Sequence, residues 1–152
     1  MNKKTVAVIA AGAMLALALP ASATPGSGVS GTVVARGTAV EKVKTRGNAP
    51  YDVVVQNLTI APGGHTGWHT HPGIAVAVVK AGTLTIYESD DESCTGHDYT
   101  AGEVYVDPGY GHVHLGRNVS SDVTLEIAVT YLDVPVGEAV RIDAADPGNC
   151  SF

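Results

Sequence analysis

Short segments with the composition of β-strands, separated by Gly, Pro and Asp, make up most of this chain. This spacing of turn residues limits the folds that the chain can adopt. Several runs alternate apolar and polar residues, as a strand with one buried face does. Beyond the N-terminal region, no segment keeps a 3.6-residue helical period. Regularly spaced short strands with such turns predict an all-β antiparallel sandwich or barrel. The expected strands are residues 32–35, 39–43, 52–60, 74–79, 83–88, 103–106, 113–115, 122–132 and 140–143.

The first residues have the pattern of a secretory signal. Lys3 and Lys4 precede an apolar stretch over residues 6–19, and Ala21-Ser22-Ala23 then forms a small-x-small cleavage site. The stretch is too short for a comfortable membrane span, and no second long apolar run follows. We therefore expect residues 1–23 to be removed and the protein to be secreted, either periplasmic or extracellular, with no membrane attachment afterwards. An uncleaved N-terminal anchor is the alternative.

Removal of this signal leaves 129 residues, which suffice for one domain with a core but not for two. We expect a flexible N-terminal segment at residues 24–30, a barrel domain at 31–145 and a C-terminal tail at 146–152. The shortened chain has 7 basic and 15 acidic side chains, a net charge of −8. This charge argues against nucleic acid or an anionic membrane as a partner. The acidic run at residues 88–92 is expected to be a solvated loop.

The chain has two cysteines, Cys94 and Cys150. In an exported protein, a disulfide between them is the default expectation. It would close a loop of about 56 residues and, in the chain-entropy treatment, contribute roughly 3–4.5 kcal/mol to stability. Two free thiols or a thiolate metal ligand are the alternatives, and neither cysteine lies near the histidine clusters in sequence.

Two short clusters, His69-Thr70-His71 and His112-Val113-His114, hold four of the six histidines. Side chains at i and i+2 of a strand point to the same face, so each cluster directs two imidazoles the same way. If the two strands face each other inside a barrel, up to four imidazoles converge. Imidazole is a common ligand of Zn, Cu, Fe and Ni. The clusters therefore predict a metal or ligand site.

Read together, the two clusters resemble the paired motifs of the cupin superfamily. In the first motif, five residues separate Gly63 from His69, and Ala75 and Gly82 follow His71 at the family spacing. In the second motif, the matching positions are Gly102, Pro108, Gly111, His114 and Asn118, with one extra residue between Pro108 and Gly111. The resemblance covers about residues 52–132. It implies a cupin-like fold, a double-stranded β-helix or jelly-roll barrel, with the histidines pointing into the mouth.

The resemblance also implies a ligand set. In the family, the two histidines and the glutamate of the first motif and the histidine of the second bind one divalent metal ion. His69, His71 and His114 match three of these ligands. The glutamate position is Ala75, which cannot coordinate a metal. The metal could be Fe, Mn, Ni, Cu or Zn.

Three interpretations of Ala75 remain open at this point. In the first, the site is a three-histidine centre with open positions for substrate and oxygen, as in some dioxygenases of the family. Because neutral imidazoles leave the metal its full positive charge, such a centre favours an anionic substrate. Alternatively, His112 replaces the lost carboxylate, or the site has lost its metal and is a histidine-lined pocket.

Other residues near the motifs are weaker candidates. His65 and Tyr110 are the candidates for assisting proton transfer, although a surface position is the simpler expectation for His65. Glu126 and Thr124 could support the metal ligands from behind, but a solvent-facing Glu126 is the favoured interpretation. The following residues are expected to be structural: Trp68 and Tyr105 by packing, and Asn118 by capping a turn.

The leading functional hypothesis is therefore a secreted cupin that binds one divalent metal through three histidines and acts as an oxygenase of a small anionic molecule. A non-catalytic cupin that binds a small ligand or a metal is the alternative. A metal-dependent isomerase or lyase is a third hypothesis. The resemblance further suggests a homodimer formed through exposed strand edges.

Overall fold

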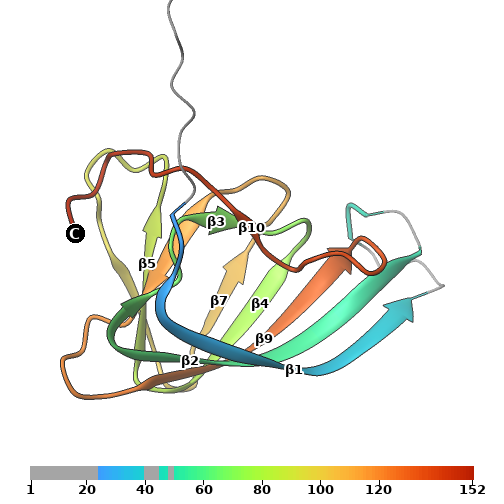
Figure 1. The fold of residues 1–152 in the computed structure, drawn as a ribbon, viewed down its shortest axis with the longest axis horizontal. Helices are drawn as coiled ribbons and strands as arrows, with labels where there is room; N and C mark the ends of the chain where they lie inside the picture. The colour runs from blue at the N-terminus through green and yellow to red at the C-terminus, as the bar shows by residue number, and fades with distance from the viewer. Residues whose placement is uncertain (1–23, 40–44, 48–49) are drawn as a thin grey trace, which may run out of the picture.

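A computed structural model describes residues 24–39, 45–47 and 50–152 (Figure 1). Within these ranges the chain forms ten strands and the fold is all-β. The expected signal, residues 1–23, and most of the expected strand at 39–43 lie outside the described residues. The strands are β1 (Ser27–Ala39), β2 (Tyr51–His65), β3 (His69–Thr70), β4 (Ala75–Ala81), β5 (Thr83–Glu88), β6 (His97–Thr100), β7 (Val104–Asp107), β8 (His114–Arg117), β9 (Leu125–Val134) and β10 (Ile142–Asp143).

The strands form one curved antiparallel sheet that rolls into a nearly closed barrel (Figure 1). The main path of the sheet runs β10-β3-β8-β2-β9-β4-β7. β1 pairs with β2, β5 pairs with β6 and β8, and all of these pairs are antiparallel. β8 pairs with β3 on one side and with β5 on the other. Because β3 contains His69 and β8 contains His114, the two histidine clusters lie beside each other on one wall of the barrel.

Strict alternation along the long strands separates the core from the surface. Along β9, Leu125, Ile127 and Val129 are buried, and the residues between them face outward. This period of two is what a sheet with one buried face requires. The strand begins three residues later than the expected 122–132, because Ser120 and Asn118 hold residues 118–123 in a hydrogen-bonded turn.

The N-terminal strand differs from the expectation. Residues 27–30, expected in a flexible segment, already pair with β2, and β1 continues through the expected run at 32–35 as far as Ala39. The sequence here is rich in Gly and Ser, which weakens a strand prediction. β1 pairs with β2 along its whole length, and this pairing supplies its backbone hydrogen bonds. The local composition gives no sign of this pairing.

Two strands were not expected. β6 has the polar sequence His-Asp-Tyr-Thr, yet it pairs with β5, where the Thr85 hydroxyl donates a 2.7 Å hydrogen bond to Asp98. β3 is only two residues long and contains His69. Neither segment has the length or apolar alternation of a predicted strand, so both depend on pairing with their neighbours in the sheet.

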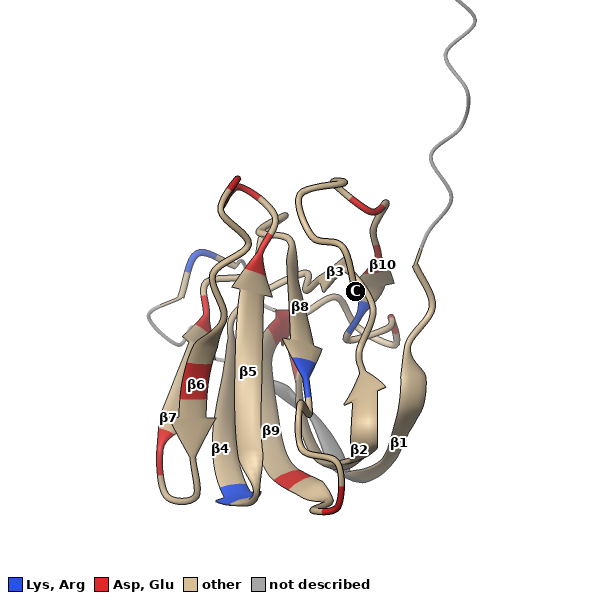
Figure 2. Ribbon diagram, turned by 90° about the vertical axis from the view of Figure 1, so that its left-hand side faces the viewer, with Lys and Arg blue, Asp and Glu red and all other residues tan. Residues whose placement is uncertain are grey.

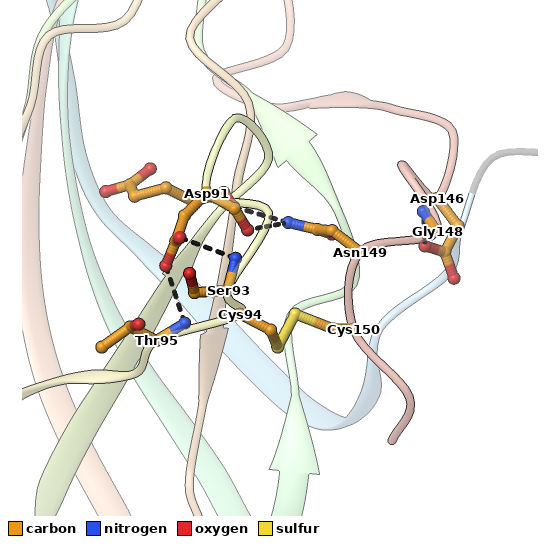
Figure 3. The surroundings of a disulfide bond; sticks show 9 residues. Asp91, Ser93, Cys94, Thr95, Asp146, Gly148, Asn149 and Cys150 are labelled. Atoms are coloured by element: carbon orange, nitrogen blue, oxygen red, sulfur yellow. Dashed lines mark hydrogen bonds between the residues drawn. A yellow bond between two sulfur atoms is a disulfide. The ribbon is translucent and has the colours of Figure 1, made fainter.

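The expected disulfide between Cys94 and Cys150 is present, with Cα atoms 5.3 Å apart (Figure 3). The loop that carries Cys94 is ordered by Asp91, whose carboxylate accepts hydrogen bonds from the amides of Ser93 and Thr95. Beside Cys150, the Asn149 amide donates to the backbone carbonyls of Glu88 and Asp91. The C-terminal tail is therefore fastened to the loop after β5 by a covalent bond and two hydrogen bonds.

Charged residues in the view of Figure 2 lie mainly in loops and near strand ends, and the middle parts of the strands contain few. This agrees with a chain of which 16% is charged. None of the described residues forms a helix long and apolar enough to cross a membrane.

Candidate metal centre

Three buried histidines converge on one wall of the barrel. His69 and His114 are directly opposite each other in the β3–β8 pair, and His71 follows two residues after His69. Their rings are 4.4–5.4 Å apart between centroids, and one ring nitrogen of each lies within 4.8 Å of the others. The side chains are only 3–5% exposed. The i, i+2 spacing and the strand pairing together produce this cluster.

Close packing of two loops fixes this geometry. The loop after β7 crosses the loop after β3, where the amide of Tyr110 donates to the carbonyl of His71. Gly109 has a φ of +64°, and a Cβ at this residue would lie 1.9 Å from the Gly73 carbonyl oxygen. Only glycine suits this backbone and this approach. The turn thus sets where the chain enters β8 and where His114 lies.

Backbone carbonyls select the tautomer of two of the rings. His69 Nδ1 lies 2.9 Å from the Gly67 oxygen, and His71 Nδ1 lies 2.6 Å from the Val140 oxygen. A carbonyl can only accept, so Nδ1 carries the proton and donates in each neutral ring. The lone pair is then on Nε2, as in metal-ligating histidines that donate their other N–H to an oxygen.

Burial keeps these imidazoles neutral. It lowers the pKa of His69 to about 3, with a further contribution from His71. Burial is also the main cause that lowers the pKa of His71 and takes the pKa of His114 well below its ordinary value. Neutral imidazole is the form that binds a metal ion. The three-histidine donor set therefore fits a divalent ion such as Zn, Cu, Fe or Ni.

The histidines form part of the lining of a cavity of about 370 Å³ inside the barrel. Its walls are mainly apolar, and of the residues that the structure describes only Arg141 and Asp107 are charged side chains in the lining. Ala75 is buried in the wall beside Tyr131 and Asp107, its neighbours across the sheet. The small side chain at this position leaves space next to the histidines. The apolar lining includes Leu58, Ala77, Leu84, Ile86, Ile127 and Val129.

Comparison with known proteins identifies the family. Residues 57–144, more than half of the chain, match the Cupin domain family. The chain belongs to the cupins. No curated protein sequence matches this cupin at a significant level.

Solved structures agree with this assignment at the level of the fold. A cupin-like protein from Thermotoga maritima is 20% identical over 80% of each chain, with a TM-score of 0.56. A polyketide cyclase from Streptomyces resistomycificus is 15% identical over 84% of each chain, with a TM-score of 0.54. A double-stranded β-helix protein from Klebsiella pneumoniae is 20% identical, covering 73% of this chain and 79% of its own, with a TM-score of 0.50. The predicted double-stranded β-helix is confirmed.

His112 does not join the other three histidines of this cupin. Its Nδ1 lies 2.7 Å from Asp107 Oδ1 and its Nε2 lies 3.1 Å from Glu88 Oε2. The ring stacks behind His114, with centroids 5.9 Å apart. His112, Asp107 and His114 form a second group with metal-ligating atoms within 4.8 Å of one another. The interpretation in which His112 replaces the lost carboxylate is therefore not favoured, because both of its ring nitrogens face carboxylates, those of Asp107 and Glu88.

The two weak catalytic candidates lie away from the cavity lining. His65 lines a separate pocket with Trp68 and Phe152, and burial and Arg117 lower its pKa. The Tyr110 hydroxyl donates to Asp133, and this bond and burial raise the pKa of Tyr110. Neither side chain is placed to exchange a proton with a molecule in the cavity.

The supporting candidates have varied positions. Glu126 is half-exposed and pairs with Lys80 at 3.3 Å, as the favoured interpretation expected. Thr124 is exposed. Tyr105 packs in the core, where its ring meets His114, and Trp68 is buried. Asn118 caps its turn by donating to the carbonyls of Ile60 and Val123.

Sequence reasoning missed Asp107, Arg141 and the Val140 carbonyl. Asp107 stands immediately before Pro108 of the second motif, and its position was a usable signal. Arg141 and Val140 reach the site because β10 pairs with β3, where Ile142 lies opposite Thr70, 72 residues earlier in the chain. No local pattern announces such a contact.

Proposed function

We propose that this cupin binds one divalent metal ion through His69, His71 and His114 and oxygenates a small anionic molecule that has an apolar body. The observation that carries the proposal is the convergence of three buried, neutral imidazoles on the wall of an apolar cavity. When bound, a redox-active metal ion would supply Lewis acidity and electron transfer at this wall.

The chain's own residues support an anionic substrate. Three neutral donors would leave the charge of a divalent ion uncompensated. Among the described residues, Arg141 is the cationic side chain of the cavity lining: its guanidinium pairs with Asp143 and donates to the Thr66 carbonyl, and its buried Nε has no hydrogen-bond partner. Ala75 leaves space for the substrate beside the histidines, and the apolar lining excludes water and holds an apolar body.

A non-catalytic binding protein is the second candidate, and a specific observation favours it. Within the described part of the chain, Asp107 is the only acid that lines the cavity, and it is already engaged by the Gly109 amide and His112. The lining formed by these residues thus offers no unengaged carboxylate for general acid or base catalysis. The same observation weighs against an isomerase or lyase, which needs such a group.

Elemental analysis of the purified, tag-free protein tests the metal centre. We expect about one equivalent of metal in the wild type and none in the His69→Ala/His71→Ala double variant. The matched control is His97→Ala, because His97 is exposed on β6 and lies outside the cluster. A wild type that neither contains metal nor takes it up on reconstitution would refute the proposal. Oxygen uptake by the loaded protein, screened against small carboxylates, separates the oxygenase from the binding protein.

The disulfide also supports a location outside the cytoplasm, because disulfides persist in oxidising compartments. We therefore include export, with removal of residues 1–23, in the proposal. Intact-mass and N-terminal analysis of the protein recovered from its native host tests this, and a mature chain that still begins at Met1 would contradict it.

A further inference from the structure

A fully buried carboxylate lies directly behind one of the three histidines. Asp107 is 0% exposed and ends β7, where it is paired with Ala75 of β4. Paired residues of adjacent strands point to the same side of the sheet, so Asp107 faces the interior as Ala75 does. Ala75 stands where the family has a glutamate, and the carboxylate of Asp107 therefore lies one strand away from that position.

The remaining nitrogen of His114 faces this carboxylate. His114 Nδ1 is buried and lacks a hydrogen bond, and Asp107 Oδ1 lies 3.5 Å from it. By contrast, backbone carbonyls hold Nδ1 of His69 and His71. A buried N–H without an acceptor is costly. Asp107 is the group placed to accept from His114 once its ring is fixed by a metal ion.

Neighbouring groups hold the Asp107 carboxylate in this orientation. The Gly109 amide donates a 3.0 Å hydrogen bond to Oδ2, and His112 Nδ1 lies 2.7 Å from Oδ1. The His112 ring is itself stacked against His114 and reaches Glu88 on its other side. Oδ1 is therefore held between the two rings of the second histidine cluster.

We propose that Asp107 is the positioning residue of this centre. It accepts a hydrogen bond from His114 Nδ1 and thereby directs Nε2 toward the metal ion. It also supplies, from behind this ligand, the negative charge that a glutamate at the position of Ala75 would supply within the donor set. His112 fixes the carboxylate for this task. The inference rests on the metal binding proposed above.

Asp107→Asn tests this assignment, because it removes the charge and keeps the shape. We expect the affinity for Zn²⁺ or Co²⁺, measured by competition titration, to fall about 10–100-fold. The matched control is Asp133→Asn. Asp133 is also a buried acid and accepts from Thr45, Gly47 and Tyr110, but none of the hydrogen bonds found for it involves a histidine. The control variant should bind the metal as the wild type does.

Two further readouts separate positioning from simple structural support. The visible absorption bands of bound Co²⁺ should shift in Asp107→Asn and not in Asp133→Asn. Adding Ala75→Glu to Asp107→Asn should recover most of the lost affinity, because a carboxylate then returns to the donor set. Thermal unfolding of the metal-free proteins shows which variants are folded.

The outcomes are distinguishable. A wild type that binds no metal refutes the proposed function itself. A metal-binding wild type with equal affinity and an equal Co²⁺ spectrum in Asp107→Asn overturns only the role of Asp107. If Asp107→Asn does not fold, His112→Gln decides: we expect its affinity to fall by about threefold or more, and unchanged affinity overturns the proposal.

Discussion

At the scale of the residue, the candidate centre depends on histidines that stay neutral because they are buried. Burial lowers the pKa of His69, His71 and His114 below the value of about 6.5 that an unfolded chain has. Below pH 6.5 the unfolded chain therefore binds more protons than the folded chain. The free energy of unfolding is therefore highest, as far as these histidines decide it, above this pH. It decreases as the pH falls toward the pKa in the folded protein, which is about 3 for His69.

The metal-free protein should therefore lose stability on acidification from pH 6.5 to 4. Each such histidine contributes up to about 1.4 kcal/mol per pH unit to the slope of the free energy of unfolding. Urea unfolding at several pH values should give a smaller slope for His69→Gln than for the wild type. His97→Gln, at an exposed residue, is the control and should keep the wild-type slope. Equal slopes for His69→Gln and the wild type would show that His69 is protonated alike in both states.

Arg141 contributes positive charge to the cavity in the proposed function, and its guanidinium is ion-paired with Asp143. We expect Arg141→Gln to weaken benzoate binding to the metal-loaded protein by about tenfold, because a charge-assisted contact is lost. Binding of neutral benzamide should not change, and Arg141→Lys should lie between the two proteins. Calorimetric titration with both ligands measures this, with metal content checked first. An equal loss for benzoate and benzamide would indicate a damaged cavity instead of a lost charge.

At the scale of the element, β10 lies across the wall that carries the proposed metal ligands. It pairs with β3, opposite His69 and Thr70, and the preceding Val140 carbonyl orients His71. The Arg141 guanidinium donates to the Thr66 carbonyl, and the Ala144 amide donates to that of Trp68. A C-terminal segment of the domain thus supports two of the proposed ligands, His69 and His71, which lie in the middle of the chain.

Breaking the β10–β3 pairing should therefore weaken metal binding while the barrel stays folded. Ile142→Pro is the direct change, since proline removes a donor and restricts the backbone of β10. We expect metal affinity to fall by about tenfold or more, in the range seen when an outer ligand support is lost. Ile142→Ala is the matched control, because the Ile142 side chain is 51% exposed and contributes little packing. Equal metal affinities of Ile142→Pro and Ile142→Ala would show that the β10–β3 pairing does not support metal binding.

At the scale of the whole molecule, the disulfide fastens the tail that continues from β10. Cys150 bonds Cys94 in the loop after β5, close to Asn149 and its two hydrogen bonds (Figure 3). A loop closed over a sequence separation of 56 restricts the unfolded chain. In the chain-entropy treatment this contributes about 4 kcal/mol.

Cys94→Ser/Cys150→Ser should accordingly lower the free energy of unfolding by about 2–5 kcal/mol. Denaturant unfolding measures the loss, and wild type treated with a reductant should show the same value. The control is Ser93→Ala/Ser151→Ala, which changes the neighbouring residues and keeps the disulfide. If the reduced wild type is as stable as the oxidised protein, the bond does not support the fold.

Predictability follows the range of the interactions. Residues 83–88 were predicted with the bounds that β5 has, because alternation and the Gly82 turn are local signals. The approximate positions of β4, β7, β8 and β9 followed from similar signals. β6, β3 and the start of β1 were missed or misplaced, because their polar or Gly-rich sequences become strands only by pairing with β5, β8 and β2.

The sequence by itself determined the all-β class, the cupin motifs and the convergence of His69, His71 and His114, because turn chemistry, two-residue periodicity and motif spacing are written along the chain. Tertiary structure alone decided the surroundings of that cluster. It placed Asp107 behind His114, turned His112 away, and brought Val140 and Arg141 to the site through β10. The physical reason is that these contacts join residues on separate strands, whose neighbours are set by the closure of the sheet.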